Sequence, residues 1–337
     1  MEPPPPLRRI TGRAVTTVLS FLVRRFLLTL PLLFIVSVMA FSLVHLLPGD
    51  PALVILGPEA PKSAVAALRS QLGLDQPVYI QYAHWLGQVL HGDLGRSLVD
   101  NTPVSSLIAQ RLGATVELAI LTFVFSTVLA VPLGIIAAKG RSTAVDYMSS
   151  GLALGGLSIP HFWLAMLLIV FFAVRMHWLP ASGYVPLTAD LAANLRFMIL
   201  PVVATGLREA GVLARFTRSS MVEVLGADYV RTARAKGLSE RIVVVKHAMR
   251  AAMIPVITAS GLQIAGLLGG LVITESVFLI PGFGRLIVDS VFTRDITVIQ
   301  GCVLVAALLV VGVNLAVDVI YTLVDPRISL STGGSQP

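Results

Sequence analysis

The chain has 337 residues, of which 55% are hydrophobic and only 13% are charged, and its mean hydropathy is +0.86. A soluble domain of this length would need more polar surface, so the composition excludes an ordinary soluble globular protein. The formal net charge of +7 is not accompanied by basic residues interleaved with aromatics, as a nucleic-acid-binding surface would require, and no nucleic-acid partner is expected.

Long apolar runs predict an all-α integral membrane protein with about six transmembrane helices, because about 20 apolar residues cross a hydrocarbon core about 30 Å thick. In chain order the predicted spans are residues 26–47, 113–138, 152–174, 197–214, 251–280 and 298–323. They divide the chain into a basic leader (1–24), a first span (25–47), an external cap region (48–112), a core (113–325) with an internal loop (215–250), and a tail (326–337).

Two segments of the cap region have the pattern of amphipathic helices. They are residues 62–72 and residues 78–90, which begin after Pro77. Glycines and Pro103 follow them as turn signals. We expect a folded cap here, and a loosely ordered linker is the alternative.

The fourth span is interrupted by Pro201 and followed closely by Arg208 and Glu209. The preferred interpretation is that this span ends early and leaves both charged residues at the membrane interface. In the alternative, they lie within the membrane, where ionisable groups are functional candidates. Adjacent residues on a helix do not face each other, so they are not expected to form a pair.

Lysine and arginine are concentrated in segments that fall on one side of a six-span protein. Residues 8–25, at the junction of the leader and the first span, carry five arginines; Lys139 and Arg141 follow the second span, and residues 208–250 contain nine basic residues. Such an asymmetry marks the cytosolic side. The N-terminus is therefore predicted to be cytosolic.

Several kinds of site are absent from the sequence. The dipeptide Gly-Lys does not occur, so the phosphate-binding loop G-x-x-x-x-G-K-[ST] is missing, and no cofactor is expected in this chain. Cys302 is the one cysteine, which excludes an intrachain disulfide. No catalytic residue and no metal site is predicted.

The internal loop contains the sequence DYVRTARAKGL at residues 228–238, followed by Met-Ile-Pro at residues 253–255. This arrangement resembles the cytosolic coupling loop of ABC importer permeases, whose pattern is Glu-Ala-Ala, three residues, Gly, nine residues and then Ile-x-Leu-Pro. Arg231, Thr232 and Ala233 occupy the Glu-Ala-Ala positions. The departure at the first two positions is a feature of one branch of that family.

That branch comprises the dipeptide, oligopeptide and nickel permeases, and the resemblance to it covers nearly the whole chain. The matching stretches are LLPGDP (46–51), LGLDQP (72–77), GDLGRS (92–97), ATVELA (114–119), SIP (158–160), LPASGY (179–184), RFTRSSM (215–221), TESVF (274–278), PGFGRL (281–286) and DPR (325–327). Each is short, but their order makes the match specific.

The resemblance implies a type I ABC importer permease fold in the bacterial plasma (inner) membrane. The implied partners are a homologous permease subunit, two cytosolic ATPase subunits that hold ATP and Mg, an external solute-binding protein and the lipid bilayer. This subunit would form half of a path for peptides or peptide-like solutes and would catalyse no reaction itself. The solute itself, among dipeptides, longer peptides, glutathione, nickel chelates and haem-like compounds, is left open.

Small residues near Gly237 would let a short helix lie close to another protein, while basic residues keep its other face solvated; Gly237 would mark the turn at its end. A basic surface helix attracted to anionic lipid is the alternative. The residues assigned to ATPase coupling are Asp228, Tyr229, Arg231, Thr232, Ala233, Arg234, Lys236, Gly237 and Leu238.

The glycine-rich fifth span predicts a gate element that lines the path, and core packing without motion is the alternative. The residues assigned to this gate are Gly266, Gly269, Gly270, Thr274 and Glu275. Glu117 and Glu275 could each meet the ammonium group of a solute, or could cap a helix. In the sixth span Asn314, Asp318, Tyr321 and Asp325 share one helical face, which is expected to face the bundle or a partner.

Three other functions are alternatives that the sequence leaves open. One is an ion-coupled secondary transporter, although no internal repeat supports it. Another is a membrane scaffold without transport. The third is an intramembrane enzyme using Ser158 and His161, which lack the third group and the Gly-x-Ser-x-Gly context of a nucleophile.

Overall fold

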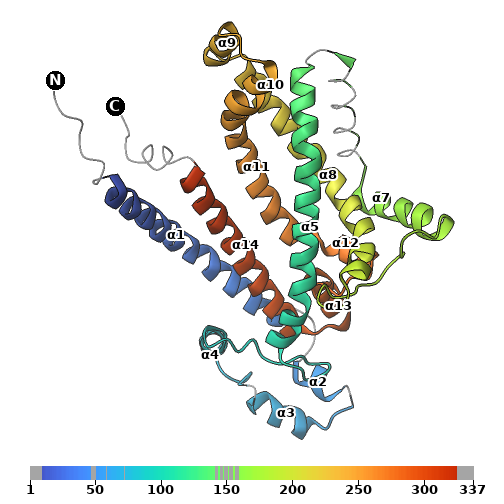
Figure 1. Cartoon of the computed structure of the whole chain (residues 1–337). Helices are drawn as coiled ribbons and strands as arrows, with labels where there is room; N and C mark the ends of the chain where they lie inside the picture. The colour runs from blue at the N-terminus through green and yellow to red at the C-terminus, as the bar shows by residue number, and fades with distance from the viewer. Residues whose placement is uncertain are drawn as a thin grey trace.

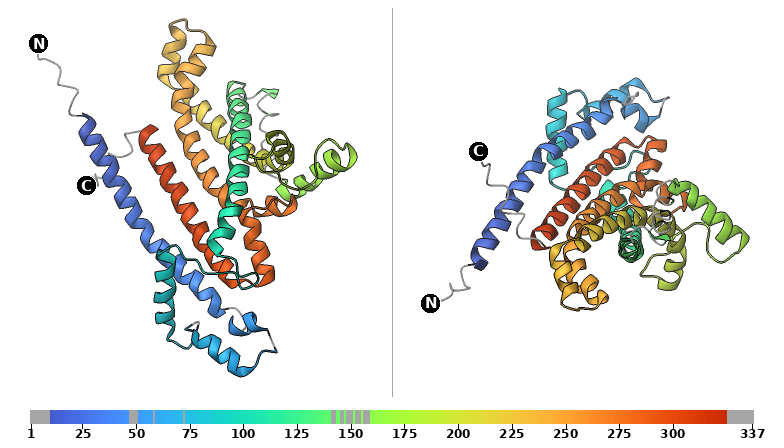
Figure 2. Two further views of the ribbon diagram at one scale, coloured as in Figure 1. Left: turned by 60° about the horizontal axis from the view of Figure 1, so that its bottom comes forward. Right: turned by 90° about the horizontal axis from the view of Figure 1, so that it is seen from above.

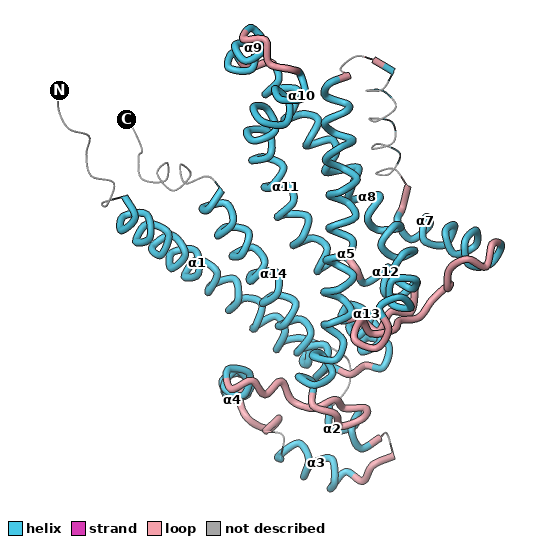
Figure 3. The backbone as a smooth tube through the Cα atoms, in the orientation of Figure 1, coloured by secondary structure: helices cyan, strands magenta, loops and turns pink. Residues whose placement is uncertain are grey.

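The computed structural model describes residues 10–46, 51–57, 59–71, 73–140 and 159–324, together with positions 143, 144, 147, 151 and 155. Helices dominate these residues, and no strand occurs among them (Figure 3). The prediction of an all-α membrane protein is confirmed.

Five helical segments of the described chain are long and apolar enough to cross a membrane: Leu27–Val44, Val104–Lys139, Leu191–Leu225, Glu240–Leu267 and Ile296–Val319. The predicted span at residues 152–174 lies partly outside the described residues. Its described part forms α7 (His161–Leu168) and the π-helix η2 (Ile169–Arg175). Together these make an apolar helical segment shorter than the five spans.

The centre of the bundle is formed by α5 (Val104–Lys139) and α8 (Leu191–Leu225) (Figure 1). Glycines allow this close approach. A Cβ atom on Gly134 would lie 2.5 Å from Cβ of Thr217, and one on Gly206 would lie 2.5 Å from Cδ1 of Phe125. Any larger residue at either position would push the two helices apart.

The fourth predicted span, residues 197–214, is part of a longer helix that does not end before Arg208, and the interfacial position of Arg208 and Glu209 stays a prediction. Asp190 caps α8 by accepting hydrogen bonds from the N–H groups of Ala192 and Ala193, and the helix continues through Pro201 to Leu225. Proline is tolerated inside a helix that neighbouring helices enclose. Arg208 and Glu209 therefore lie within the helix, and their side chains do form a pair.

The prediction of one continuous fifth span at residues 251–280 is wrong. The chain enters the bundle through α10 (Glu240–Ile242), the π-helix η3 (Val243–Ala248) and α11 (Met249–Gly270), and α11 ends at Gly270. After Leu271 a separate short helix, α12 (Val272–Val277), leads to α13 (Phe283–Thr293). Hydropathy cannot register this break, because the residues on both sides of it are apolar.

The first and last helices, α1 (Ile10–Leu46) and α14 (Ile296–Val324), lie side by side at one edge of the bundle (Figure 2). The Nε atom of Arg25 lies 2.7 Å from a carboxylate oxygen of Asp318. Asp318 thus faces α1, as predicted for its helical face, whereas Asn314 is exposed. Tyr321 has no described side-chain environment, and Asp325 lies outside the described residues.

Three short helices, α2 (Pro51–Leu56), α3 (Lys62–Gln71) and α4 (Val78–Leu90), lie at one end of the bundle (Figure 1). The last two coincide with the predicted amphipathic segments. In α4, Tyr82 and Trp85 pack on Phe41 of α1, with ring centroids 5.4 and 5.6 Å apart. The helix α9 (Asp228–Ala235) lies at the opposite end.

Candidate coupling helix and buried carboxylate network

The predicted coupling segment forms α9, which has one buried face and one exposed face. Val230 and Ala233 are buried and belong to a cluster with Ala138 of α5 and Met221 of α8. Alanine at position 233 therefore lets α9 pack against its own chain. The exposed face carries the other assigned residues, Asp228, Tyr229, Arg231 and Thr232, and the segment after α9 carries Lys236 and Leu238.

Arg234 holds α9 in place. Its guanidinium donates to both carboxylate oxygens of Glu240, at 3.1 and 2.8 Å, and to the carbonyl oxygen of Leu225 at 3.3 Å. The hydrogen bonds to Glu240 raise the pKa of Arg234. The Arg234 side chain thus connects α8, α9 and α10. The sequence had suggested only that it keeps one face of the helix solvated.

Gly237 ends the turn after α9, as predicted. Its φ angle is +75°, a left-handed conformation that favours glycine, and its N–H donates to the carbonyl oxygen of Arg234. Apart from its two chain neighbours, no residue in the described part of the chain lies within 4 Å of where its Cβ atom would be. The space beside Gly237 is therefore open to another protein.

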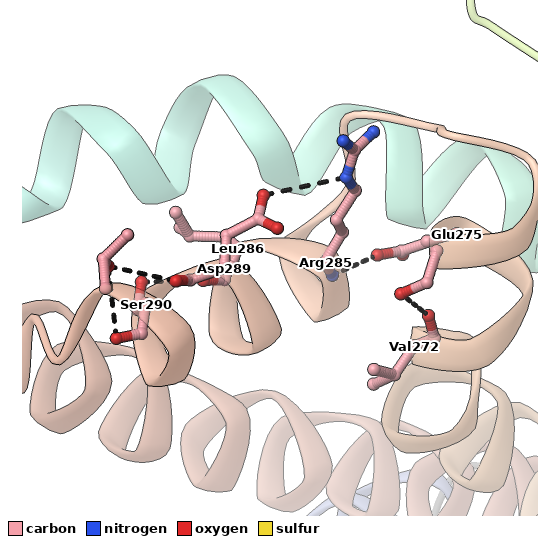
Figure 4. Close-up of polar contacts among 8 residues, drawn as sticks. Val272, Glu275, Arg285, Leu286, Asp289 and Ser290 are labelled. Atoms are coloured by element: carbon pink, nitrogen blue, oxygen red, sulfur yellow. Dashed lines mark hydrogen bonds and ion pairs between the residues drawn. The ribbon is translucent and has the colours of Figure 1, made fainter.

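At the other end of the bundle, Glu275 of α12 is fully buried, and Figure 4 shows it beside Arg285 in the first turn of α13. One carboxylate oxygen accepts a hydrogen bond from the Thr115 hydroxyl at 2.6 Å, and the other accepts one from the Arg285 backbone N–H at 2.8 Å. The Thr115 oxygen in turn accepts a hydrogen bond from the backbone N–H of Phe283 at 2.7 Å. The first turn of α13 is thus capped from α12 and α5.

This geometry is the helix-capping arrangement that was the alternative for Glu275. Thr274 is also buried, and its hydroxyl lies 2.8 Å from that of Thr205 on α8. Neither side chain faces an open passage in this conformation, and their assignment to a gate stays a prediction. In contrast, Cβ atoms added to Gly266, Gly269 and Gly270 would meet open space, so these glycines pack against no described part of the chain.

Glu117 likewise has a positioning role in this structure. Its carboxylate accepts hydrogen bonds from the Tyr184 hydroxyl at 2.8 Å and from the Asn194 amide at 2.6 Å. Burial, together with the hydrogen bond to Glu117, raises the pKa of Tyr184 to about 12. These contacts connect α5, the loop before α8 and α8 itself.

Among the described residues no group of three or more His, Cys, Asp or Glu side chains could hold a metal ion. Ser158, one of the two residues considered for an intramembrane enzyme, lies outside the described residues. His161 begins α7, directly after Pro160. Sequence reasoning missed the Thr115–Glu275 contact, because the two residues lie 160 positions apart.

Comparison with known proteins identifies the family to which this chain belongs. The family described as binding-protein-dependent transport system inner membrane component matches residues 130–330, and its N-terminal part matches residues 18–119. The chain belongs to this family. It is therefore a membrane-spanning transport subunit, as predicted, and not an enzyme, a secondary transporter or a scaffold.

Relatives cover almost the full length of the chain. A glutathione transport system permease protein (GsiC) of Escherichia coli strain K12 is 47% identical over 310 residues, which are 92% of this chain and 99% of the relative. A putative peptide transport system permease protein of Brucella suis is 43% identical over 309 residues, 92% of this chain and 98% of the relative.

Among solved structures, the inward-facing MetNI methionine ABC transporter has a chain with a TM-score of 0.55 and 19% sequence identity to this one. The match covers 65% of this chain and 96% of that chain. The likeness supports the type I importer permease fold.

Proposed function

We propose that this chain forms half of the translocation path of an ATP-driven importer for peptides or peptide-like solutes. An external binding protein delivers the solute, a homologous permease supplies the other half of the path, and two cytosolic ATPases hold ATP and Mg. The names of the relatives, which refer to peptide and glutathione transport, support this solute class. Alternating access between inward- and outward-open states moves the solute.

The observation that carries the proposal is the exposed face of α9. Tyr229 and Leu238 expose apolar side chains at one tip of the bundle, next to the exposed Arg231 and Lys236. Aromatic and arginine side chains are common anchors at protein interfaces. A helix with such a face, tethered to the bundle by Arg234, can transmit closure of an ATPase pair to the spans.

Co-purification tests the assembly. The chain, expressed with its genomic neighbours, should purify with two ATPase subunits and a second permease, and a solute-binding protein should stimulate ATP hydrolysis. Purification without any ATPase subunit would contradict the proposal. Collapsing an ion gradient should leave uptake unchanged, whereas ATP depletion should abolish it.

Gly237 offers a matched pair of variants for the coupling role. Gly237→Ala and Gly237→Trp both place a side chain on a left-handed backbone and share a strain of about 1–2 kcal/mol. The Cβ atom that both variants add meets no described residue beyond its chain neighbours within 4 Å, and position 237 is exposed. We therefore take an added effect of tryptophan over alanine as the report of contact with another subunit. We expect Gly237→Trp to uncouple ATP hydrolysis from uptake while the chain remains inserted. Equal uptake by the two variants would refute the contact.

Orientation can be tested separately. Cys302 is buried, so the native chain gives a low background for thiol labelling. Single cysteines at positions 231–236 should react with an impermeant reagent only from the cytosolic side. Reaction from outside would overturn the proposed topology and the cytosolic N-terminus.

A further inference from the structure

Arg208 is a half-exposed cation inside a membrane-spanning helix. Its side chain is 51% exposed and lies near the midpoint of the 35-residue α8. Two residues later, Ala210 is buried in a cluster with Ala130 of α5 and Val256 of α11. Ala130 precedes the end of α5 at Lys139 by about 14 Å along the helix. The level of Arg208 is therefore well inside the bundle.

The exposed side of α8 at this level carries two arginines and a serine, with the partly buried Val212 among them and the exposed Phe216 next to Arg215. Positions 208, 212, 215 and 219 share one side of a helix. Arg208, Arg215 and Ser219 are exposed there, whereas most other residues of α8 from Pro201 to Ser220 are buried or partly buried. The two arginines are about 10 Å apart along the axis. Lipid is an unfavourable neighbour for such a stripe, which suits a water-filled passage.

The guanidinium of Arg208 has capacity for another acceptor. In the described part of the chain it contacts Glu209, with Nη1 3.2 Å from Oε1. That contact engages one of its five N–H donors. Glu209 is only 16% exposed, so it can orient the guanidinium from behind while the planar fork faces the open side. A carboxylate matches that fork with two parallel hydrogen bonds.

We propose that Arg208 lines the translocation path and binds the carboxylate of the peptide-like solute, with Arg215 as a second cation two helical turns closer to α9. This inference rests on the proposed function and adds a specificity-determining residue to it. Glu209 is a positioning residue. The competing explanation, an acidic side chain of the second permease on Arg208, is an outcome of the test below.

Accessibility is the first test, made on the complete importer in proteoliposomes. Arg208→Cys should react with water-soluble methanethiosulfonate reagents, and a transported tripeptide at saturating concentration should slow the reaction at least severalfold. Cys302 is buried, and labelling is measured on this chain after the subunits are separated. An unreactive Arg208→Cys in the assembled complex, or a reaction rate unaffected by tripeptide, would overturn the proposal.

The second test asks whether solute uptake requires a positive charge at position 208. Arg208→Gln should lower kcat/KM for uptake of a radiolabelled tripeptide about tenfold or more, as expected for the loss of a charge-assisted hydrogen-bonded pair. Co-purification with the second permease and the ATPase subunits should be retained. Modifying Arg208→Cys with an ethylammonium group should restore uptake severalfold, and an ethylsulfonate group should not. Equal effects of both groups would refute carboxylate binding.

Arg175→Gln is the matched control, because Arg175 is an exposed arginine at the end of η2, away from the stripe; it should leave uptake unchanged. Loss of co-purification with the second permease in Arg208→Gln would assign Arg208 to the subunit interface and overturn the proposal. Absence of ATP-dependent uptake in the unmodified complex would instead refute the proposed function, and the labelling of Arg208→Cys would still decide whether this residue faces water.

Discussion

The contact between Glu275 and Gly282 allows a double-mutant test of the buried carboxylate network. A Cβ atom on Gly282 would lie 2.2 Å from the carboxylate carbon of Glu275. Gly282→Ala must therefore displace this carboxylate from Thr115 and from the Arg285 N–H. Gly282 has an ordinary φ angle of −95°, so alanine introduces no backbone strain and the cost comes from the displaced carboxylate.

The magnitude follows from the hydrogen bonds that are lost. Displacing the carboxylate weakens two charge-assisted hydrogen bonds, so Gly282→Ala should lower the free energy of unfolding by about 2–4 kcal/mol. Glu275→Ala leaves the Thr115 hydroxyl and the Arg285 N–H buried without their acceptor and opens a cavity. It should lower the free energy of unfolding by about 3–5 kcal/mol. In the double variant, the methyl group at position 282 no longer meets a carboxylate. The two costs should therefore fall short of additivity by about 2 kcal/mol or more.

The measurement is a denaturant titration of the detergent-solubilised chain, followed by tryptophan fluorescence, for the unmodified protein and the three variants. The reasoning is refuted if the two single costs add to within about 0.5 kcal/mol in the double variant. It is equally refuted if Gly282→Ala has no cost. Either result would mean that the carboxylate does not occupy the position described for it.

Three further predictions concern the packing of the bundle and its tethers. Gly206→Ala should cost about 1–3 kcal/mol in unfolding free energy, because the methyl group would meet the ring of Phe125; the control Gly113→Ala, at an open helical position, should be neutral or slightly stabilising. Arg234→Ala should speed amide hydrogen exchange in α9 but cost at most about 1 kcal/mol, since the ion pair is solvated and screened by salt. The buried carboxylate of Asp295 accepts hydrogen bonds from the Ser97 hydroxyl and the Leu98 N–H in the loop before α5. Asp295→Ala removes this acceptor and should therefore increase protease cleavage of that loop.

Hydropathy located most of the bundle but not the ends of its helices. The runs at residues 113–138 and 298–323 correspond well to α5 and α14. Residues 197–214 underestimate α8 because its continuation carries charged and polar residues, such as Arg215, that end an apolar run without ending the helix. The break after Gly270 is invisible for the opposite reason: apolar residues lie on both sides of the turn.

The coupling helix was predictable because its signal is local. The turn at Gly237 and the basic residues before it lie within one short segment, so spacing alone indicates the helix and its end. The buried network is different, because Thr115, Glu275 and Phe283 meet only once three helices have packed. Glu275 and the Pro281–Gly284 turn are close in sequence, but the partner on α5 could come only from the tertiary structure.

The contacts at the two ends of α8 suggest how movement at α9 would reach the opposite end of the bundle. Near its end at Leu225, α8 packs through Met221 against the buried face of α9. Nearer its start, the hydroxyl of Thr205 meets Thr274, next to the carboxylate that caps α13. The helix between Thr205 and Met221 is continuous and about 24 Å long.

A displacement of α9 would therefore reach the Glu275 network through one continuous helix. Arg208 projects from the open side of this same helix, so tilting α8 would change the position of the guanidinium relative to the solute. Coupling of this kind requires that α8 move as one body. Two glycine substitutions between Thr205 and Met221, at positions that face neither α5 nor α11, should weaken the link between ATP hydrolysis and uptake while both end contacts remain intact. Full coupling in such a variant would show that the force travels through other helices.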